Sequence, residues 1–208
     1  MIRLAIAPES PDGAVVTHAI DVLRRGGIVA YPTDTLYGLA VDPRDDTAVA
    51  RLFDAKGRED RMAIPLIASS LDQALAAAAM TSTEVALARR FWPGPLTIVA
   101  SAQASLARAV LGGRSTVAIR VPSHPVACAI AAAFGFCITA TSANKSGEAA
   151  ASRADEISDA LAAHIDLLLD AGQVTGGLPS TIVEIAASGP RLVRPGAVPW
   201  ERVLESLE

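Results

Sequence analysis

The sequence predicts an α/β fold, a single domain with a largely buried mixed sheet flanked by helices. Short apolar runs alternate with amphipathic segments along most of the chain, as in folds that cover a sheet with helices. Hydrophobic residues make up 51% of the chain and aromatic residues only 4%, so the core must be aliphatic. A length of 208 residues suits one domain, taken as residues 1–208.

The helices are indicated by amphipathic spacing and by residues that favour helix ends. Pro11 near the start and Gly26 at the end bound the first periodic segment. Gly57 stops the second, and Thr81 with Glu84 has capping-box spacing at the fourth. The expected helices span residues 11–27, 46–57, 70–79, 81–92, 124–134, 153–163 and 199–208.

The strands are indicated by short apolar runs, many of them rich in β-branched residues. They are expected at residues 3–7, 28–32, 64–69, 96–102, 116–122, 136–141, 165–171 and 181–186. The last strands, at about 181–194, follow one another without an intervening helix. The sheet is therefore expected to contain both parallel and antiparallel pairs.

Composition excludes several classes of protein. A net charge of −4 and a pI near 5.4 argue against a broad basic face for nucleic acid, although a local basic pocket stays compatible with them. Cys128 and Cys137 lie in apolar runs without a metal-binding spacing, which favours a reduced, buried pair. The apolar run at the N-terminus is too short for a signal peptide, and residues 74–79 are too short to span a bilayer. We expect a cytoplasmic protein without a membrane partner.

Small polar clusters follow several of the expected strands. They occupy residues 33–38, 141–147 and 173–181, and two strands end at Arg120 and Arg194. Any one cluster is equally well explained as an ordinary turn, because Ser, Thr, Asn and Gly are common in loops. Ligands of open α/β sheets bind beyond strand ends, so the clusters together with these cations favour a shared anionic ligand.

Several common catalytic motifs are missing from the sequence. It contains no GxGxxG and no GxSxG, and Leu178 stands where a P-loop spacing from Gly172 would require lysine. His18, His124 and His164 are isolated from other metal-ligand residues. No metal site and no protein nucleophile are indicated, which favours chemistry that works by holding reactive ligands in place.

Only two of the 18 basic residues are lysines, Lys56 and Lys145. Lysine presents a compact point charge that can approach a phosphate, whereas arginine presents a broad planar fork. The scarcity of lysine therefore raises the question of whether Lys56 or Lys145 is needed for contact with a phosphate.

Seven short motifs occur in the order typical of the YrdC-like (TsaC) L-threonylcarbamoyladenylate synthases, which this chain resembles over about residues 12–197. They are YPTDTLYGL at 31–39, AKGR at 55–58, WPGPLT at 92–97, AIRVP at 118–122, TSAN at 141–144, PSTIV at 179–183 and RPG at 194–196. The resemblance implies a twisted α/β fold with an open, positively lined cavity. A C-terminal helix at about 199–208 follows this core.

The resemblance implies a reaction and its partners. L-threonine, bicarbonate or CO2 and ATP would give threonylcarbamoyl-AMP and pyrophosphate, with Mg²⁺ carried by ATP rather than by protein ligands. Downstream transferase proteins would use the product to make threonylcarbamoyl-adenosine in tRNA. Contact of this chain with tRNA itself is expected to be weak or indirect.

Site residues follow from the matching positions. Lys56 and Arg58 would be catalytic, holding the ATP phosphates. The remaining ATP ligands would be Thr116, Ser142, Asn144 and Arg194. Threonine would be bound by Thr35, Arg120, the backbone at Ala140, and Ser180.

The chain departs from the family pattern near the second motif. Glu59 and Met62 replace a proline and an Asn or Lys that are frequent in relatives, and Ile67 replaces a histidine present in some of them. Arg61 is a candidate substitute for the missing cation. Three alternatives remain open at this point: an RNA-binding or ribosome-associated module, a carbamoyl-AMP-forming enzyme that uses carbamoyl phosphate, and a relative that binds nucleotide without turnover.

Overall fold

A computed structural model describes residues 1–57, 62–174 and 177–207. Two functional predictions, Arg58 and Arg61, lie outside these residues. The helices are α1 (Gly13–Arg24), α2 (Asp46–Lys56), α3 (Leu71–Ala77), α4 (Ser82–Phe91), α5 (Pro125–Phe134), α6 (Asp159–Ala162) and α7 (Trp200–Glu205), with 3-10 turns at Arg108–Leu111 and Ala154–Glu156. The strands are β1 (Ile2–Ala5), β2 (Val29–Pro32), β3 (Tyr37–Ala40), β4 (Leu66–Ile67), β5 (Ala78–Ala79), β6 (Leu96–Ala102), β7 (Thr116–Arg120), β8 (Ile138–Thr139), β9 (Thr141–Ser142), β10 (Leu167–Asp170), β11 (Thr181–Ala186) and β12 (Gly189–Arg194).

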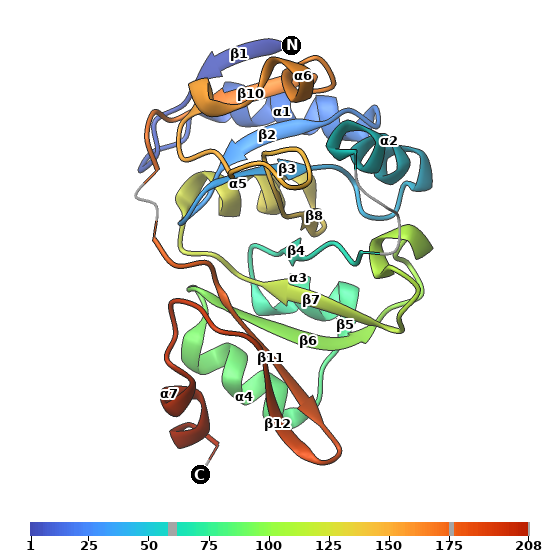
Figure 1. The fold of residues 1–208 in the computed structure, drawn as a ribbon, viewed down its shortest axis with the longest axis vertical. Coiled ribbons are helices and arrows are strands. Elements are labelled where there is room, and N and C mark those ends of the chain that lie inside the picture. Colours follow the sequence, from blue (N-terminus) through green and yellow to red (C-terminus); the bar gives the residue numbers. More distant parts are fainter. Residues whose placement is uncertain (58–61, 175–176, 208) are drawn as a thin grey trace.

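The strands form two mixed sheets rather than one. A five-stranded sheet has the order β1-β10-β2-β3-β9, and a seven-stranded sheet has the order β12-β11-β6-β7-β4-β8 with β5 paired to β6. Figure 1 shows the two sheets one above the other along the long axis, with α1, α2 and α5 around the upper sheet and α3, α4 and α7 around the lower one. The predicted mixed α/β architecture is confirmed.

Between β8 and β9, one residue, Ala140, carries the chain from one sheet to the other. It separates β8, which belongs to the lower sheet, from β9, which belongs to the upper one. The backbone N–H of Ala140 donates to the carbonyl of Pro65 at 2.8 Å. The fully buried Thr139 hydroxyl donates to the carbonyl of Leu39 at 3.1 Å and accepts from the backbone N–H of Val41 at 2.9 Å. The two sheets are thus joined by hydrogen bonds where their strands meet.

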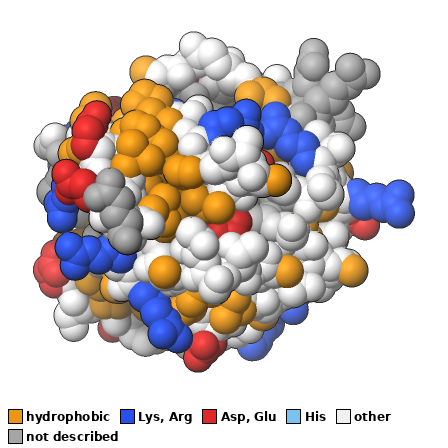
Figure 2. Space-filling model, turned by 90° about the horizontal axis from the view of Figure 1, so that it is seen from below, with side chains coloured by type: hydrophobic (Ala, Val, Ile, Leu, Met, Phe, Trp, Pro, Cys, Tyr) orange, Lys and Arg blue, Asp and Glu red, His pale blue; other side chains and the backbone are white. Residues whose placement is uncertain are grey.

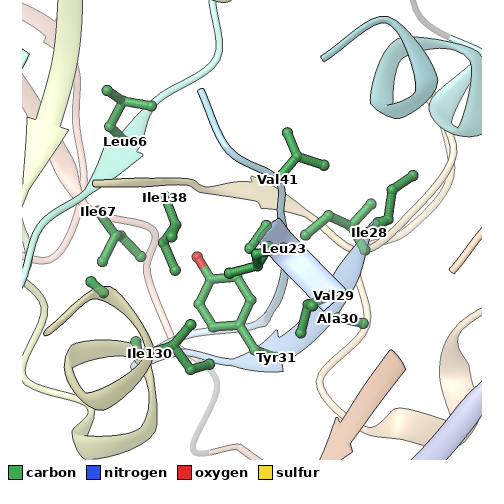
Figure 3. Packing of buried hydrophobic residues seen from close by; sticks show 14 of the residues in the cluster. Leu23, Ile28, Val29, Ala30, Tyr31, Val41, Leu66, Ile67, Ile130 and Ile138 are labelled. Carbon is green, nitrogen blue, oxygen red and sulfur yellow. The ribbon is translucent and has the colours of Figure 1, made fainter. Parts of the chain in front are cut away.

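Two hydrophobic clusters stabilise the two halves. The larger cluster surrounds Tyr31, whose ring lies among aliphatic side chains from several elements (Figure 3) and whose hydroxyl donates to the Thr139 carbonyl at 3.1 Å. The smaller cluster includes Leu96, Val183 and Val203, so it attaches α7 to the lower sheet. Within α7, Val203 is fully buried, whereas Leu204 is 37% exposed.

Two local predictions were wrong. The predicted helix at 153–163 is broken into a 3-10 turn and the short α6. The Glu156 carboxylate accepts from the backbone N–H groups of Ser152 and Arg153, which caps the start of the 3-10 turn. The turn ends at Ile157, whose backbone is extended with ψ at 118°. The strand β3 was not among the predicted strands; it begins inside the polar cluster at 33–38 and pairs antiparallel with β2.

Within the described residues, no helix is long and apolar enough to cross a membrane.

Candidate functional site

A cavity of about 430 Å³ opens at the junction of the two sheets. Its wall includes the β2–β3 turn, the end of β7, the Ala140 junction, and the segment that enters β11. This volume lies in the range typical of small-molecule sites. Among the described residues on its wall, the charged ones are Arg120 and Arg194, so the cavity offers positive charge to an anionic ligand.

All four residues predicted to bind threonine lie on this wall, although they come from distant parts of the sequence: Thr35, Arg120, Ala140 and Ser180. Thr35 sits in the β2–β3 turn, which the Thr33 side chain closes by donating to the Leu36 carbonyl at 2.6 Å. Ala140 lines the cavity at the point where the chain changes sheet.

Arg120 ends β7 and is only 8% exposed. Its Nη1 donates to Asp34 Oδ2 at 2.7 Å, and Asp34 Oδ1 accepts from the Ser123 hydroxyl at 2.8 Å. Burying a guanidinium is costly unless a carboxylate pairs with it, and Asp34 provides this counter-charge. The ion pair therefore holds Arg120 in place on the cavity wall.

Arg194 and Thr97 hold Ser180 from two sides. The Arg194 guanidinium donates from Nε and Nη2 to the Ser180 carbonyl at 3.2 and 2.7 Å, and from Nη2 to the Ser180 hydroxyl at 3.1 Å. The buried Thr97 hydroxyl lies 2.8 Å from the same Ser180 oxygen. Burial, followed by repulsion from Arg120, lowers the pKa of Arg194 below its usual value. Both guanidinium groups line the same cavity.

Gly196 explains why the RPG motif ends in glycine. A Cβ at this position would lie 2.2 Å from the Pro179 carbonyl oxygen and 2.6 Å from the Ser180 carbonyl carbon. The backbone of the 179–181 segment passes directly over Gly196, and Ala197 donates to the Pro179 carbonyl at 2.9 Å. The segment that presents Ser180 can lie here only because position 196 lacks a side chain.

Lys56 is buried beneath the TSAN loop rather than exposed on the cavity wall. It is 4% exposed, and its ammonium donates to the carbonyls of Ser142 and Asn144, both at 2.6 Å. The Ser142 hydroxyl contacts Asn144 Oδ1, and the Asn144 amide donates to the carbonyl of Glu148 at 2.9 Å. Of these residues Ser142 lines the cavity, while Lys56 and Asn144 shape the loop from behind.

Other positions singled out in the sequence lie away from the cavity wall. Thr116 begins β7, four residues before Arg120, which puts it roughly 13 Å away along the strand. Ile67 is fully buried in the main core, and Met62 is 55% exposed and does not line the cavity. Within the described residues, no three His, Cys, Asp or Glu side chains form a group that could hold a metal ion.

Sequence reasoning missed Asp34, Thr97 and Gly196 as parts of the site. Each lies inside a motif that carried the resemblance, but none was given a role. A weak signal was available, since Asp34 is a charged residue two positions after an apolar strand and Thr97 is a polar residue within one. Their partners are 86 and 83 residues away in the sequence, so the pairing itself could not be read from spacing.

Comparisons with known proteins identify the family to which the chain is similar. The Sua5/YciO/YrdC family model, described as telomere recombination, matches residues 21–196. A threonylcarbamoyl-AMP synthase of Halorhodospira halophila is 41% identical over 86% of this chain and 94% of its own length. Another of the same name, from Pyrococcus abyssi, is 37% identical over 89% of this chain, which spans about half (55%) of that relative's length.

A solved structure shows the same fold with a ligand. The crystal structure of Pyrococcus abyssi Sua5 complexed with L-threonine is 33% identical, has a TM-score of 0.92, and matches 99% of this chain and 61% of its own.

Proposed function

The chain belongs to the Sua5/YciO/YrdC family, and we propose that it is a threonylcarbamoyl-AMP synthase. In this reaction L-threonine, bicarbonate and ATP give threonylcarbamoyl-AMP, pyrophosphate and water. The observation that supports the proposal most strongly is that Arg120, Ser142 and the Ser180–Arg194 pair line a single cavity, although they come from three separate parts of the sequence. The names of the relatives and the threonine complex of a homologue support it.

Threonine is assigned to the part of the cavity bounded by the β2–β3 turn and the end of β7. Arg120 can bind a carboxylate through its planar fork, and Asp34 already fixes the direction of that fork. Thr35, the Ala140 backbone and Ser180 provide the polar groups for the amine and hydroxyl of the amino acid. The arrangement of these groups suits a small zwitterion.

ATP is assigned to the neighbouring part, between the TSAN loop and Arg194. Arg194 supplies a cation for the phosphates, and Ser142 supplies a hydroxyl on the cavity wall. Lys56 contributes by holding the loop that carries Ser142, and Asn144 contributes in the same way. Arg58 is proposed as a phosphate ligand from the sequence resemblance alone. Thr116 does not line the cavity, so it could contact ATP only if the nucleotide extends beyond the cavity.

The chemistry requires positioning and neutralisation of charge rather than a covalent intermediate. The threonine amine and bicarbonate form a carbamate, whose oxygen attacks the α-phosphorus of ATP as pyrophosphate leaves. Negative charge on the phosphate oxygens is offset by Arg194 and by Mg²⁺ that arrives with the triphosphate. Hydroxyl and cationic groups line the cavity, which suits a magnesium ion held by ATP and water rather than by carboxylates.

The product is a mixed anhydride that water would hydrolyse, so it must pass to another protein. We assign that role to transferase proteins that modify tRNA in the cytoplasm. Direct contact of this chain with tRNA is proposed to be weak or indirect. On the face shown in Figure 2, the Lys and Arg side chains that are described lie scattered among acidic and apolar ones. A continuous basic surface would be needed for strong binding to a nucleic acid.

The experiment is a reconstitution with the purified chain, labelled L-threonine, bicarbonate and Mg²⁺·ATP. We expect a labelled adenylated product and an equal amount of pyrophosphate, both of which require threonine and bicarbonate. Reactions that lack one substrate serve as controls, and carbamoyl phosphate replaces threonine and bicarbonate in a further reaction. Pyrophosphate release that is independent of threonine, or none at all, would show that the proposed activity is wrong.

A further inference from the structure

We infer that Asp34 is a positioning residue that sets the affinity of the site for the amino-acid carboxylate, acting through Arg120. This inference rests on the proposed function. Asp34 and Arg120 form the most buried ion pair among those described, with side chains 15% and 10% exposed and a separation of 2.7 Å. An arginine buried to this degree takes its orientation from its partner, because a desolvated guanidinium without a counter-charge is costly.

Asp34 is itself held firmly. Its second oxygen accepts from the Ser123 hydroxyl at 2.8 Å, so both carboxylate oxygens have partners from the β7 side of the site. The backbone of Asp34 lies in the turn that Thr33 closes by donating to the Leu36 carbonyl at 2.6 Å. Because the backbone of Asp34 and both of its carboxylate oxygens are held in place, Asp34 can act as an anchor for Arg120, that is, it can fix the orientation of the guanidinium.

The position of Asp34 separates this role from direct contact with substrate. Asp34 and Ser123 line a second cavity, of about 380 Å³, whereas Arg120 lines the main one. The ion pair therefore lies between the two cavities, with the carboxylate on the side of the second. Asp34 engages Nη1 of Arg120 from there, and an arginine has five N–H donors in its fork, so donors remain for a ligand in the main cavity.

Loss of Asp34 would have two opposing effects on the affinity for L-threonine. The larger of the two decides whether the Kd rises or falls. Removing the negative charge of Asp34 makes the cavity more positive, which favours a substrate carboxylate. Removing the anchor lets the guanidinium rotate, which destroys the geometry of a bidentate pair. We expect the effect of orientation to be larger, because a bidentate pair depends on the direction of both N–H bonds, whereas Arg194 already gives the cavity positive charge when Asp34 is present.

The test compares three variants by equilibrium titration with L-threonine and, separately, with an ATP analogue. Asp34→Ala removes both charge and anchor, and Asp34→Asn removes the charge but keeps an oxygen that can accept from Arg120. Asp42→Asn is the matched control, because Asp42 pairs with Arg44, is 17% exposed, and does not line the main cavity. L-threonine methyl ester, which lacks the carboxylate, is titrated alongside.

We expect Asp34→Ala to raise the Kd for L-threonine about tenfold to hundredfold, as for loss of a hydrogen bond to a charged group, with ATP-analogue affinity changed less than about twofold. Asp34→Asn should recover affinity to within about fivefold of the wild type. The ester should bind weakly and should not be weakened further by Asp34→Ala. Asp42→Asn should match the wild type.

Several outcomes would overturn the inference. They are an unchanged or tighter L-threonine Kd in Asp34→Ala, an equal loss for threonine and the ATP analogue, or an equal loss in Asp34→Asn and Asp34→Ala. A wild-type chain that binds no threonine would contradict the proposed function as well. A wild type and an Asp34→Ala variant that bind threonine equally would contradict the role of Asp34 alone.

Discussion

Replacing Lys56 by methionine removes a buried charge while keeping an unbranched side chain of similar length. The Lys56 ammonium donates to two backbone carbonyls at 2.6 Å beneath the loop that presents Ser142, and the residue is 4% exposed. Loss of these bonds leaves the carbonyls of Ser142 and Asn144 without this donor. Lys56 is therefore expected to affect both stability and ATP use.

The magnitude follows from the cost of unpaired polar groups. Hydrogen bonds to a charged group contribute about 1.5–3 kcal/mol each. Water that reaches the Ser142 and Asn144 carbonyls in the variant would restore part of this free energy. We expect Lys56→Met to lower the free energy of unfolding by about 2–4 kcal/mol, a large part of the ~5–15 kcal/mol typical of a domain. The protein should still fold, and its KM for ATP should rise.

The assay is urea unfolding followed by circular dichroism without ligand, with the slope of the transition compared between variants. Lys145→Met is the matched control, because Lys145 is the second lysine, lies next to the same loop, and does not line the cavity. It should change the free energy of unfolding by less than about 0.5 kcal/mol. If Lys56→Met unfolds at the same urea concentration as the wild type, or if both lysine variants lose the same stability, this reasoning is refuted.

Three other predictions follow from the structure. Ser180→Ala should raise the KM for threonine more than that for ATP, as steady-state kinetics would show; equal effects would argue against the threonine assignment. Gly196→Ala should cost about 2–3 kcal/mol in urea unfolding and reduce threonine use, because its Cβ would overlap the Pro179 carbonyl; full stability would contradict the close approach. Burial raises the pKa of Asp170, but hydrogen bonds from the Gly172 N–H and from Arg3 outweigh it, so its pKa lies below the usual value. This pair stabilises the fold above the unfolded pKa of about 3.9, and the contribution is lost as pH falls through the lower folded pKa. Asp170→Asn should therefore be less stable than the wild type at pH 7, and this difference in the free energy of unfolding should become smaller as the pH is lowered below about 3.9. A difference that does not change with pH would contradict this account.

Much of the fold could be predicted, because its signals are local. The capping box at Thr81 and Glu84, the left-handed Gly57 that ends α2, and Gly135 after α5 are encoded within a few residues of the element they bound. The division into two sheets could not be predicted. It depends on Thr139 and Ala140, which bond to residues about 100 and 75 positions earlier in the chain, and apolar runs do not specify their partners.

The candidate site shows the same limit. Arg120 and Ser180 could be placed on a shared cavity because each follows or precedes a strand inside a recognisable motif. The direction in which a side chain points could not be predicted from the motifs. The Lys56 ammonium donates to the carbonyls of Ser142 and Asn144 in the TSAN loop, and these partners lie 86 and 88 residues later in the sequence.

The central claim is that one cavity at the junction of the sheets binds threonine beside ATP. A crystal structure of the chain with L-threonine and a non-hydrolysable ATP analogue tests it most directly. We predict the threonine carboxylate within hydrogen-bonding distance of Arg120 and the phosphates beside Ser142 and Arg194. Threonine or nucleotide bound elsewhere on the molecule, with this cavity empty, would contradict the account.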